Sequence, residues 1–461
     1  MLTACLFLPH PPIAVPGVGD RCSPSLTGGF DRAAAIAREI EPDIVVCLSP
    51  HGQSYPGHVS VHTARRWKYS FAGFGAPSVC LDLEIDRGFT SELLFELSSA
   101  GIKFAPNSGG DDPHDHGAAV PLYFLSPGIT ARYAVISPGG HEASELKAIG
   151  RAIRRVCDRV EGKALLLASG DQSHYLSEDG PYGFNQAGAE YDKRVVEIFQ
   201  NDPRDFLKTD RASVNAAGQC AFEPWSIALE AIGDDEAAFE FIGYEAPYGV
   251  GYLMASAKLA APAPKSAGGL DPYCTLARAA VFGAVCAREP SDYSQLAHLL
   301  PRSARSEIEG TRAGAFVSIH SGGDLRGCIG LIEPVHDHLG HAICYCAHQA
   351  ALYDPRFPPI TPEELSTLVI NIDVLGQPEP VKNTDTLDVR RYGVIVSSGR
   401  KRGLLLPDLE GVDTPEQQIG IALGKAGIRP GEDYSLERFE VIRHLETIGP
   451  EGRIDDSQTR P

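Results

Sequence analysis

Short apolar runs alternate with segments of helical periodicity in the first half of the chain. Apolar runs without polar alternation are typical of strands that are buried on both faces of a sheet. Segments whose apolar residues recur every three or four positions predict helices that cover such a sheet. The pattern therefore predicts an α/β domain with helices on both faces of a central sheet. The predicted strands are Leu2–Leu8, Ile44–Ser49, Tyr133–Ser137 and Ala164–Ser169, and the predicted helices are Arg32–Ile40, Ser144–Val160 and Gly188–Phe199.

The second half of the chain mixes the two patterns in a different order. Helical segments stand at its beginning and near its end, and strand-like segments lie between them. This order predicts a smaller domain of the α+β class. The predicted helices are Pro272–Arg288 and Gln417–Ala426, and the predicted strands are Ala315–His320, Thr367–Leu375 and Gly393–Ser397.

The stretch LAAPAPKSAGGL at residues 259–270 separates the two halves. Alternating alanine and proline followed by serine and glycine favours an extended, then flexible, tether. A chain of 461 residues also exceeds what one hydrophobic core usually organises. We therefore predict a first domain at 1–258, a linker at 259–270, a second domain at 271–447 and a C-terminal tail at 448–461.

The composition of the chain argues against several classes of protein. The formal net charge of -19 argues against nucleic acid or an anionic membrane as a partner, because such partners need a basic face. The 11 cysteines follow no regular spacing, which favours reduced thiols over a disulfide framework. No apolar run approaches the roughly 20 residues of a membrane helix, and the N-terminus lacks the basic region of a signal peptide. We expect a cytoplasmic protein.

Three histidines of the first domain follow predicted strands directly. His10 comes after the first strand, His51 after the second, and His174 after the strand that ends at Ser169. Ligand sites of α/β sheets form beyond the carboxyl ends of the strands. Any one of these histidines alone fits a structural, hydrogen-bonded residue, but three equivalent positions favour one shared metal or acid–base site.

Four short motifs surround these histidines in a fixed order within the first 258 residues. They are LPHPP beginning at Leu8, SPHG at Ser49, DHG at Asp115 and GDQSH at Gly170. In this order they resemble the class III extradiol ring-cleavage dioxygenases, a superfamily of LigB-type enzymes and related Memo proteins. The resemblance implies that His10 and His51 are metal ligands. It also implies that His174 is the catalytic acid–base group and that His116 hydrogen-bonds bound substrate or dioxygen.

The third metal ligand is open between two residues. In the dioxygenases it is a glutamate late in the domain, which matches Glu223 at the start of a predicted helix ending at Ile232. In Memo proteins a cysteine occupies this region, and Cys220 lies three residues before Glu223. We favour Glu223, because a carboxylate that opens a helix matches the dioxygenase arrangement.

The choice of the third ligand separates two functional classes. Two imidazoles and one carboxylate on Fe(II) leave positions for substrate and oxygen, as in non-haem iron oxygenases. We then expect a dioxygenase that cleaves a small catechol or aminophenol-like ring with O2. A cysteine thiolate would favour zinc or copper, and the alternative is a Memo-like metal or redox protein without ring cleavage. A third possibility is a scaffold that recruits a partner and whose metal is structural.

The second domain contains the motif LRGCIG at 325–330, with DPRFPP at 354–359 and KAGI at 425–428. Glycines of this kind permit tight turns or the close approach of another surface. Arg326 is a candidate anion-binding group and Cys328 a candidate reactive thiol, but on the sequence alone we prefer a hairpin or loop with a small buried cysteine. These motifs resemble the AMMECR family over residues 270–447. Relatives in which this domain follows a Memo-like domain imply a radical S-adenosylmethionine protein as a partner.

The sequence gives less support to a functional role for the other histidines. His58 and His62 lie in an alternating segment that predicts an exposed strand face. His114 and His141 are candidate neighbours of the metal pocket. Further along, two histidines and a cysteine share one face of a predicted helix, which permits a second metal site but also fits a small core cysteine. These three residues are His341, Cys344 and His348.

Overall fold

The computed structural model describes residues 1–19, 22–109, 114–260 and 271–446. Contacts between residues divide the chain into two compact units, Met1–Ser266 with Cys286–Glu289 and Ala267–Val285 with Pro290–Pro461. The division falls within the predicted linker. Leu259 and Ala260 are described, and Leu259 is the last residue of a strand; the rest of that linker and the predicted tail lie outside the described residues.

The first unit is built on an eight-stranded mixed sheet with the order β6-β3-β7-β2-β8-β1-β10-β9. Its central strands β7, β2, β8 and β1 are parallel and almost completely buried, as continuous apolar runs predict. Strands β9 and β10 add an antiparallel edge. The strands are β1 (Leu2–Leu8), β2 (Ile44–Leu48), β3 (Val59–His62), β6 (Phe104–Asn107), β7 (Arg132–Ser137), β8 (Ala164–Ser169), β9 (Ala237–Glu245) and β10 (Tyr252–Leu259), with a separate hairpin of β4 (Arg66–Ser70) and β5 (Cys80–Glu84).

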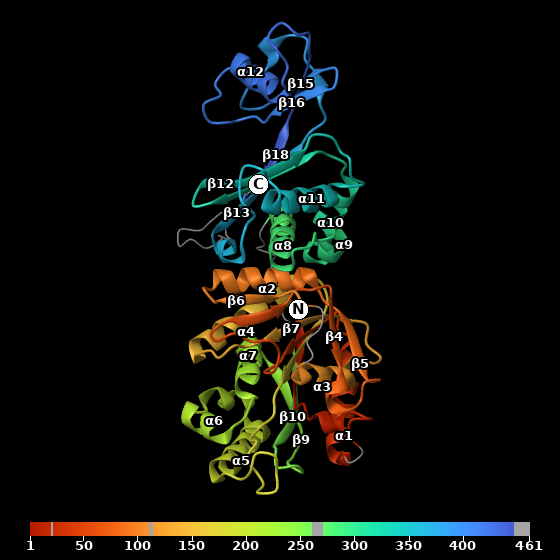
Figure 1. Ribbon diagram of the computed structural model, residues 1–461, viewed down its shortest axis with the longest axis vertical. Helices are drawn as coiled ribbons and strands as arrows, with labels where there is room; N and C mark the ends of the chain where they lie inside the picture. Colours follow the sequence, from red (N-terminus) through yellow and green to blue (C-terminus); the bar gives the residue numbers. More distant parts are fainter. Residues whose placement is uncertain (20–21, 110–113, 261–270, 447–461) are drawn as a thin grey trace. The chain divides into compact units, whose positions relative to one another are not determined.

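Helices cover both faces of this sheet, which confirms the predicted α/β class. Alternate residues of β1 contact different layers: Leu6 belongs to the core with Phe30 of α1, whereas the Phe7 ring lies 5.4 Å from that of Trp225 on α7. Figure 1 shows α4 and α7 on one side of the sheet and α1 and α3 on the other. The helices are α1 (Pro24–Ile40), α2 (Arg87–Ser99), α3 (His116–Leu125), α4 (Ala143–Arg159), α5 (Gln186–Asn201), α6 (Arg211–Ala217) and α7 (Phe222–Ile232), with short 3-10 turns at Pro12–Ala14, Phe71–Phe74 and Pro203–Lys208.

Strand β3 corrects one sequence prediction. The alternating segment from His58 to His62 was expected to show an exposed face, but all four residues of β3 are buried. Successive side chains of a strand point to opposite faces, so the burial of all four shows that both faces of β3 are covered. His62 is hydrogen-bonded through Nε2 to the carbonyl of Arg66 at 3.2 Å, which identifies it as a structural histidine.

The second unit contains two antiparallel four-stranded sheets and several helices, in agreement with the predicted α+β class. The sheets have the orders β12-β11-β13-β18 and β14-β17-β15-β16. The strands are β11 (Ala315–Ser321), β12 (Asp324–Leu331), β13 (Leu368–Leu375), β14 (Glu379–Pro380), β15 (Gly393–Ser398), β16 (Lys401–Leu405), β17 (Ser435–Phe439) and β18 (Val441–His444). The helices are α8 (Pro272–Ala287), α9 (Tyr293–Leu296), α10 (Arg302–Gly310), α11 (Leu339–Leu352) and α12 (Pro415–Ala426), with 3-10 turns at Ala297–Leu299, Pro362–Thr367 and Thr384–Thr386.

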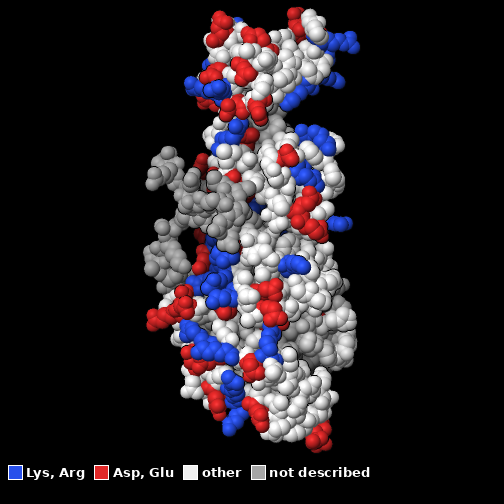
Figure 2. Space-filling view, turned by 90° about the vertical axis from the view of Figure 1, so that its left-hand side faces the viewer, with Lys and Arg blue, Asp and Glu red and all other residues white. Residues whose placement is uncertain are grey.

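The surface carries charges of both signs. Basic and acidic side chains are interspersed over the face shown in Figure 2. Within the described residues, no helix is both long and apolar enough to cross a membrane. All 11 cysteines of the chain are free thiols.

Candidate metal centre

Two histidines and a cysteine meet beyond the carboxyl ends of the central strands. His10 follows β1, His51 follows β2, and Cys220 lies just before α7. Their Nε2 and Sγ ligand atoms all lie within 4.8 Å of one another. The two Nε2 atoms are 3.1 Å apart, and Cys220 Sγ is 3.5 Å from His10 Nε2. We refer to these three residues as the His2Cys cluster.

The orientation of His10 is fixed by a hydrogen-bond chain behind it. The Ser169 hydroxyl donates its one proton to the carbonyl of Gly117 at 2.5 Å. Ser169 Oγ must therefore accept from His10 Nδ1, which lies 2.9 Å away. This arrangement leaves the lone pair on His10 Nε2, the atom that faces His51 and Cys220, so the ring is held in the form that binds a metal.

Asp171 is hydrogen-bonded to both His10 and Cys220. The sequence motifs did not identify it as a site residue. Its carboxylate accepts from the backbone N–H of His10 at 2.9 Å, and its backbone N–H donates to Cys220 Sγ at 3.2 Å. Its carbonyl accepts from the backbone N–H of Cys220 at 3.1 Å. Burial raises the pKa of Asp171 to about 7. The sequence did contain an indication of its role, because Asp171 lies in the GDQSH motif directly after a buried strand.

The expected third ligand, Glu223, is not part of this cluster. Its carboxylate accepts from the backbone N–H groups of Gly140 at 3.2 Å and His141 at 3.1 Å. The guanidinium of Arg211 lies 3.9 Å from the same carboxylate. Glu223 therefore ties the start of α7 to the loop after β7, and Cys220 occupies the place next to the histidine pair.

The two proposed catalytic histidines both lie beside the cluster. The His116 ring stacks on that of His51 at 4.5 Å, and His174 Nε2 is 3.8 Å from Cys220 Sγ. An aromatic side chain lies beside each of them. The ring centroids of Phe74 and His116 are 5.7 Å apart, and those of Tyr182 and His174, which are stacked, are 5.1 Å apart. Both aromatic side chains are exposed, whereas His51 and Cys220 are half-buried and His10 is buried.

The DHG motif supports the position of His51. Asp115 caps α3 by accepting from Ala118 N–H at 3.0 Å, and it also accepts a short hydrogen bond from the Ser49 hydroxyl. A Cβ atom at Gly117 would lie 2.5 Å from Ser49 Oγ and 3.2 Å from the His51 ring. Only glycine therefore lets α3 approach the loop that carries His51.

Burial keeps the imidazoles neutral. It lowers the pKa of His51 to about 4 and lowers the pKa of His10 well below its ordinary value. Burial also lowers the pKa values of His116 and His174. Neutral imidazole is the form that binds metal or accepts a proton, so both pairs have the protonation state that their expected roles need.

The cluster matches the donor set and spacing of a four-coordinate site. Imidazole nitrogens at about 2.0–2.1 Å and a thiolate at about 2.3 Å from a tetrahedral ion lie about 3.3 Å (N–N) and about 3.6 Å (N–S) apart. The distances of 3.1 and 3.5 Å in the cluster are close to these values. Three protein ligands leave a fourth position, as in catalytic zinc sites. The residues therefore fit a bound metal ion.

The remaining candidate histidines of the first unit lie outside the cluster. His141 is buried, and its Nδ1 is 3.5 Å from the Glu145 carboxylate, next to the loop that Glu223 holds. His114 is exposed, and its carbonyl accepts from His116 N–H at 2.9 Å. His58 Nδ1 is bonded to the carbonyl of Pro56 at 2.9 Å.

Arg326 is not the anion-binding group that the sequence suggested. Its guanidinium donates to both carboxylate oxygens of Glu364 at 2.7 and 3.1 Å. It also donates to the carbonyls of Pro358 at 2.8 Å and Pro359 at 3.3 Å. These bonds join the LRGCIG motif to the DPRFPP motif, so Arg326 has a structural role. Cys328 is half-buried on β12 and accepts from the Ser318 hydroxyl at 3.2 Å.

The histidine-rich helix gives no second metal cluster. Within the part of the chain that the structure describes, His10, His51 and Cys220 form the one group with metal-ligand spacing. On α11, Cys344 is buried in the core and His341 lies 3.9 Å from the Asp292 carboxylate. The cysteine is therefore a small core residue, the alternative that the sequence left open.

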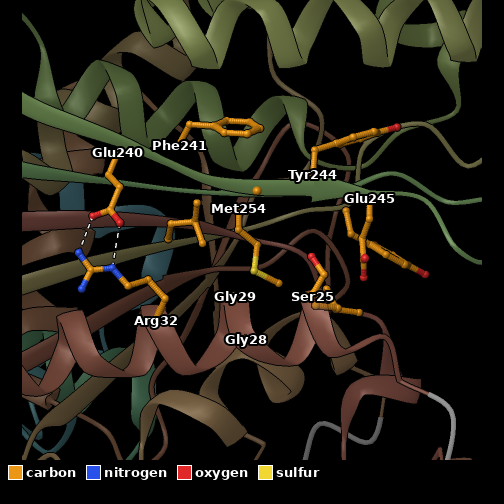
Figure 3. A pocket seen from close by; sticks show the side chains of 13 residues that line it. Ser25, Gly28, Gly29, Arg32, Glu240, Phe241, Tyr244, Glu245 and Met254 are labelled. Carbon is orange, nitrogen blue, oxygen red and sulfur yellow. Dashed lines mark hydrogen bonds and ion pairs between the residues drawn. The ribbon is translucent and has the colours of Figure 1, made fainter.

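A hollow between α1 and the β9–β10 edge contains none of the predicted site residues. It has a volume of about 280 Å³. Figure 3 shows Met254 above Gly28 and Gly29, with an ion pair between Arg32 and Glu240 at one end. This hollow has no metal-ligand cluster and lies apart from the strand ends that carry the histidines.

Comparison with known proteins assigns both halves of the chain. Residues 4–255 match the model of the catalytic LigB subunit of aromatic ring-opening dioxygenase, and residues 274–444 match that of AMMECR1. Protein CA_C1420 of Clostridium acetobutylicum is 33% identical over 480 residues, which cover 97% of this chain and 100% of that protein. A protein of Thermotoga maritima is 49% identical over 144 residues, which cover 31% of this chain and 83% of its own length.

Two solved structures are also similar. Uncharacterized protein PH0010 from Pyrococcus horikoshii is 29% identical with a TM-score of 0.35, covering 40% of this chain and 93% of its own. Uncharacterized protein JW3007 from Escherichia coli is 16% identical with a TM-score of 0.40, covering 55% of this chain and 99% of its own. The LigB model matches more than half of the chain, and the Clostridium relative aligns over nearly all of it. The chain therefore belongs to the LigB family of aromatic ring-opening dioxygenase catalytic subunits and continues into an AMMECR1 domain.

Proposed function

We propose that the first domain is a Memo-like metal protein whose ligands are His10, His51 and Cys220. The observation that carries this proposal is the position of Cys220 Sγ, 3.5 Å from His10 Nε2, while Glu223 accepts from backbone N–H groups. A thiolate selects soft or borderline ions, so zinc or copper is the expected metal. This donor set lacks the carboxylate on which the iron dioxygenase prediction depended.

The protein residues around the ion have distinct tasks in this proposal. A zinc ion would act as a Lewis acid at the open position, and copper would exchange one electron. Ser169 and Asp171 hold His10 and Cys220 in place. His174, neutral and 3.8 Å from the Cys220 sulfur, would accept a proton from a molecule bound at the open position.

Ring cleavage is the second candidate, and one observation favours it. His116 and His174, the two histidines that the dioxygenase resemblance makes catalytic, both lie beside the His2Cys cluster. In that case Fe(II) would occupy the cluster, with a catechol or aminophenol ring and O2 as substrates. The third possibility, a scaffold with a structural metal, fits less well because three protein ligands leave a fourth position, as in catalytic sites. A radical S-adenosylmethionine partner stays a prediction from the family resemblance.

Oxygen uptake distinguishes the two leading candidates. The full chain would be loaded anaerobically with Fe(II), zinc or Cu(I) in separate samples and mixed with catechols and aminophenols. We expect no oxygen uptake above the protein-free rate with any metal. Uptake coupled to a ring-opened product in the Fe(II) sample would overturn the proposal in favour of the dioxygenase.

The variant His174→Ala tests whether His174 is a metal ligand or only a proton carrier. We expect it to bind the same amount of metal as the natural chain, because His174 is outside the three-residue cluster. Metal content by elemental analysis measures this directly. A variant that loses its metal would identify His174 as a ligand and would require a different donor set.

A further inference from the structure

The sheet β12-β11-β13-β18 of the second domain buries one face and leaves the other beside a cavity. Along β11, every second residue from Ala315 to Ile319 is buried, and the alternate residues point the opposite way. Those alternate residues, Phe316, Ser318 and His320, line a cavity of about 730 Å³. This volume lies in the range of small-molecule sites, about 300–1,000 Å³.

The LRGCIG motif forms part of the cavity wall. Leu325, Cys328 and Gly330 of this motif line the cavity. A Cβ atom at Gly330 would lie 2.2 Å from the ring of Phe316, so this ring can lie over the strand only because residue 330 is glycine. Arg326 donates to two carbonyls of the DPRFPP segment and so holds the motif in place. The distinctive motif of this domain therefore shapes one wall of the cavity.

The second sheet supplies a further wall. Leu404 and Leu405 of β16 line the cavity. Leu404 also belongs to a core cluster that contains Leu375 of β13 and Phe439 of β17. Because buried side chains join the two sheets, the walls of the cavity belong to one packed domain. Figure 1 labels β12 and β13 of the first sheet and β15 and β16 of the second.

Exposed leucines gather at this cavity. Three leucines of the described chain are exposed, and all three line it. They are Leu325, Leu409 and Leu445, with 38%, 36% and 55% of their surfaces accessible. They come from three separate segments, near the start of β12, in the loop after β16 and directly after β18. Exposed apolar side chains that gather at one concave site favour the binding of an apolar group.

The charged groups of the cavity are balanced within the protein. Each of its three arginines is paired with a carboxylate of the same domain. The two remaining charged residues, Lys425 and Asp408, have opposite signs. A charged ligand would lose hydration and find no excess of the opposite charge, which costs free energy. The cavity therefore favours an uncharged ligand. The three pairs are Arg356–Asp354, Arg402–Glu333 and Arg443–Asp373.

Uncharged polar groups of three neighbouring strands lie side by side in the cavity wall. Ser318 of β11 is in register with Cys328 of β12 on one side and Asn371 of β13 on the other. The Ser318 hydroxyl donates to Cys328 Sγ at 3.2 Å, and its oxygen can still accept. Asn371 Oδ1 accepts from the backbone N–H of Glu446 at 3.1 Å, so the other end of the amide is a donor NH2 group. Both side chains can therefore bond a carbonyl or hydroxyl group of a ligand.

We propose that this cavity binds an uncharged organic molecule with an apolar body and a carbonyl or hydroxyl group. The leucines and Phe316 would contact the body, and Ser318 and Asn371 would bond the polar group. Cys328, the conspicuous residue of the motif, is a wall residue of this site. The proposal is independent of the metal centre, because every residue that it uses belongs to the second domain.

Binding is tested by calorimetry on the full chain with probes of one apolar chain length. Octanol and octanamide are uncharged, octanoate and octylamine carry opposite charges near neutral pH, and acetamide lacks the apolar chain. We expect saturable one-to-one binding of octanol, octanamide or both, and binding weaker by about tenfold or more for the other three probes. Binding of either charged chain as tight as that of the uncharged chains, or no binding of either uncharged chain, would overturn the proposal. The tighter of the two uncharged chains identifies the polar group.

Two pairs of variants locate the bound probe. Leu409→Asp and Leu445→Asp should each weaken binding of the uncharged chain by about tenfold, because each removes an apolar contact. Ile421→Asp and Ile442→Asp are their controls, since both isoleucines are exposed and neither lines the cavity. Circular dichroism confirms that each variant is folded. Binding that is unchanged in both cavity variants, or equally lost in the controls, would contradict this location.

Discussion

Single hydrogen bonds decide which side chains of the first domain face the metal centre. Cys220 and Glu223 are only three residues apart, and both stand at the beginning of α7. The backbone bond from Cys220 N–H to the Asp171 carbonyl holds the sulfur beside His10, and Glu223 turns to the Gly140 loop. Sequence spacing could predict the region of the third ligand but not this direction, because it depends on contacts between distant segments.

The Ser169 hydroxyl provides a test of how His10 is held. Ser169→Ala removes the acceptor for His10 Nδ1–H, and we expect metal affinity to fall about 10–100-fold. Ser226→Ala is the matched control, since Ser226 is also buried but its hydroxyl has no hydrogen-bond partner among the described residues. Zinc titration with a chelating dye measures both. Equal affinity in the two variants would show that this hydrogen bond does not orient the ligand.

Asp192 makes the stability of the first domain depend on pH. Burial raises its pKa to about 7 from the 3.8 of an exposed carboxyl, although Tyr244 and Ser173 donate to it. At a pH between these two pKa values, the Asp192 carboxyl is deprotonated in the unfolded chain and protonated in the folded chain. This group therefore lowers the free energy of unfolding by up to about 1.4 kcal/mol per pH unit as pH rises from about 4 to 7.

The variant Asp192→Asn removes this titration. We expect the difference in unfolding free energy between the two proteins to shift in favour of the variant as pH rises from 5 to 8. Tryptophan fluorescence in urea measures it, because both tryptophans of the chain, Trp67 and Trp225, are buried in the first unit. A difference that is constant with pH would contradict the shifted pKa.

At the scale of helices and strands, the sequence predicted the buried parallel strands at the centre of the first sheet. The strands β1 and β8 begin and end where the apolar runs do, since continuous burial leaves no polar alternation. The half-buried edge strand β9 was not predicted, and β3 was wrongly taken as exposed. Their burial depends on which strands become neighbours, which a local pattern does not record.

Helix α1 offers a matched test of packing between elements. Gly29 faces β10, where an added Cβ would lie 2.2 Å from Met254 Sδ, whereas an added Cβ at Gly28 would meet no atom within 4 Å (Figure 3). Because the obstructing atom is the flexible end of Met254, which lines a hollow into which it can move, we expect Gly29→Ala to be less favourable than Gly28→Ala by only about 1 kcal/mol. Gly28→Ala should stabilise the first domain by about 0.5–1 kcal/mol through helix propensity. Urea unfolding followed by tryptophan fluorescence measures both, and equal effects of the two substitutions would contradict this packing.

At the scale of the whole molecule, the chain combines two separate kinds of site. The first domain brings the three residues of the His2Cys cluster together from distant segments, beyond the ends of its central strands. The second domain has a cavity of about 730 Å³ that is lined by residues of both of its sheets. The division into two domains and the histidines of the metal centre could be predicted from the sequence. The cavity could not, because its walls come from alternate residues of strands far apart in the chain.

X-ray absorption at the zinc edge tests the central claim, a metal held by His10, His51 and Cys220. We predict that the zinc-loaded full chain shows one sulfur ligand at about 2.3 Å with two imidazoles. The sulfur signal should disappear in Cys220→Ser and persist in Glu223→Gln. A spectrum with only nitrogen and oxygen ligands, altered by Glu223→Gln and unchanged by Cys220→Ser, would contradict the account and make Glu223 the third ligand.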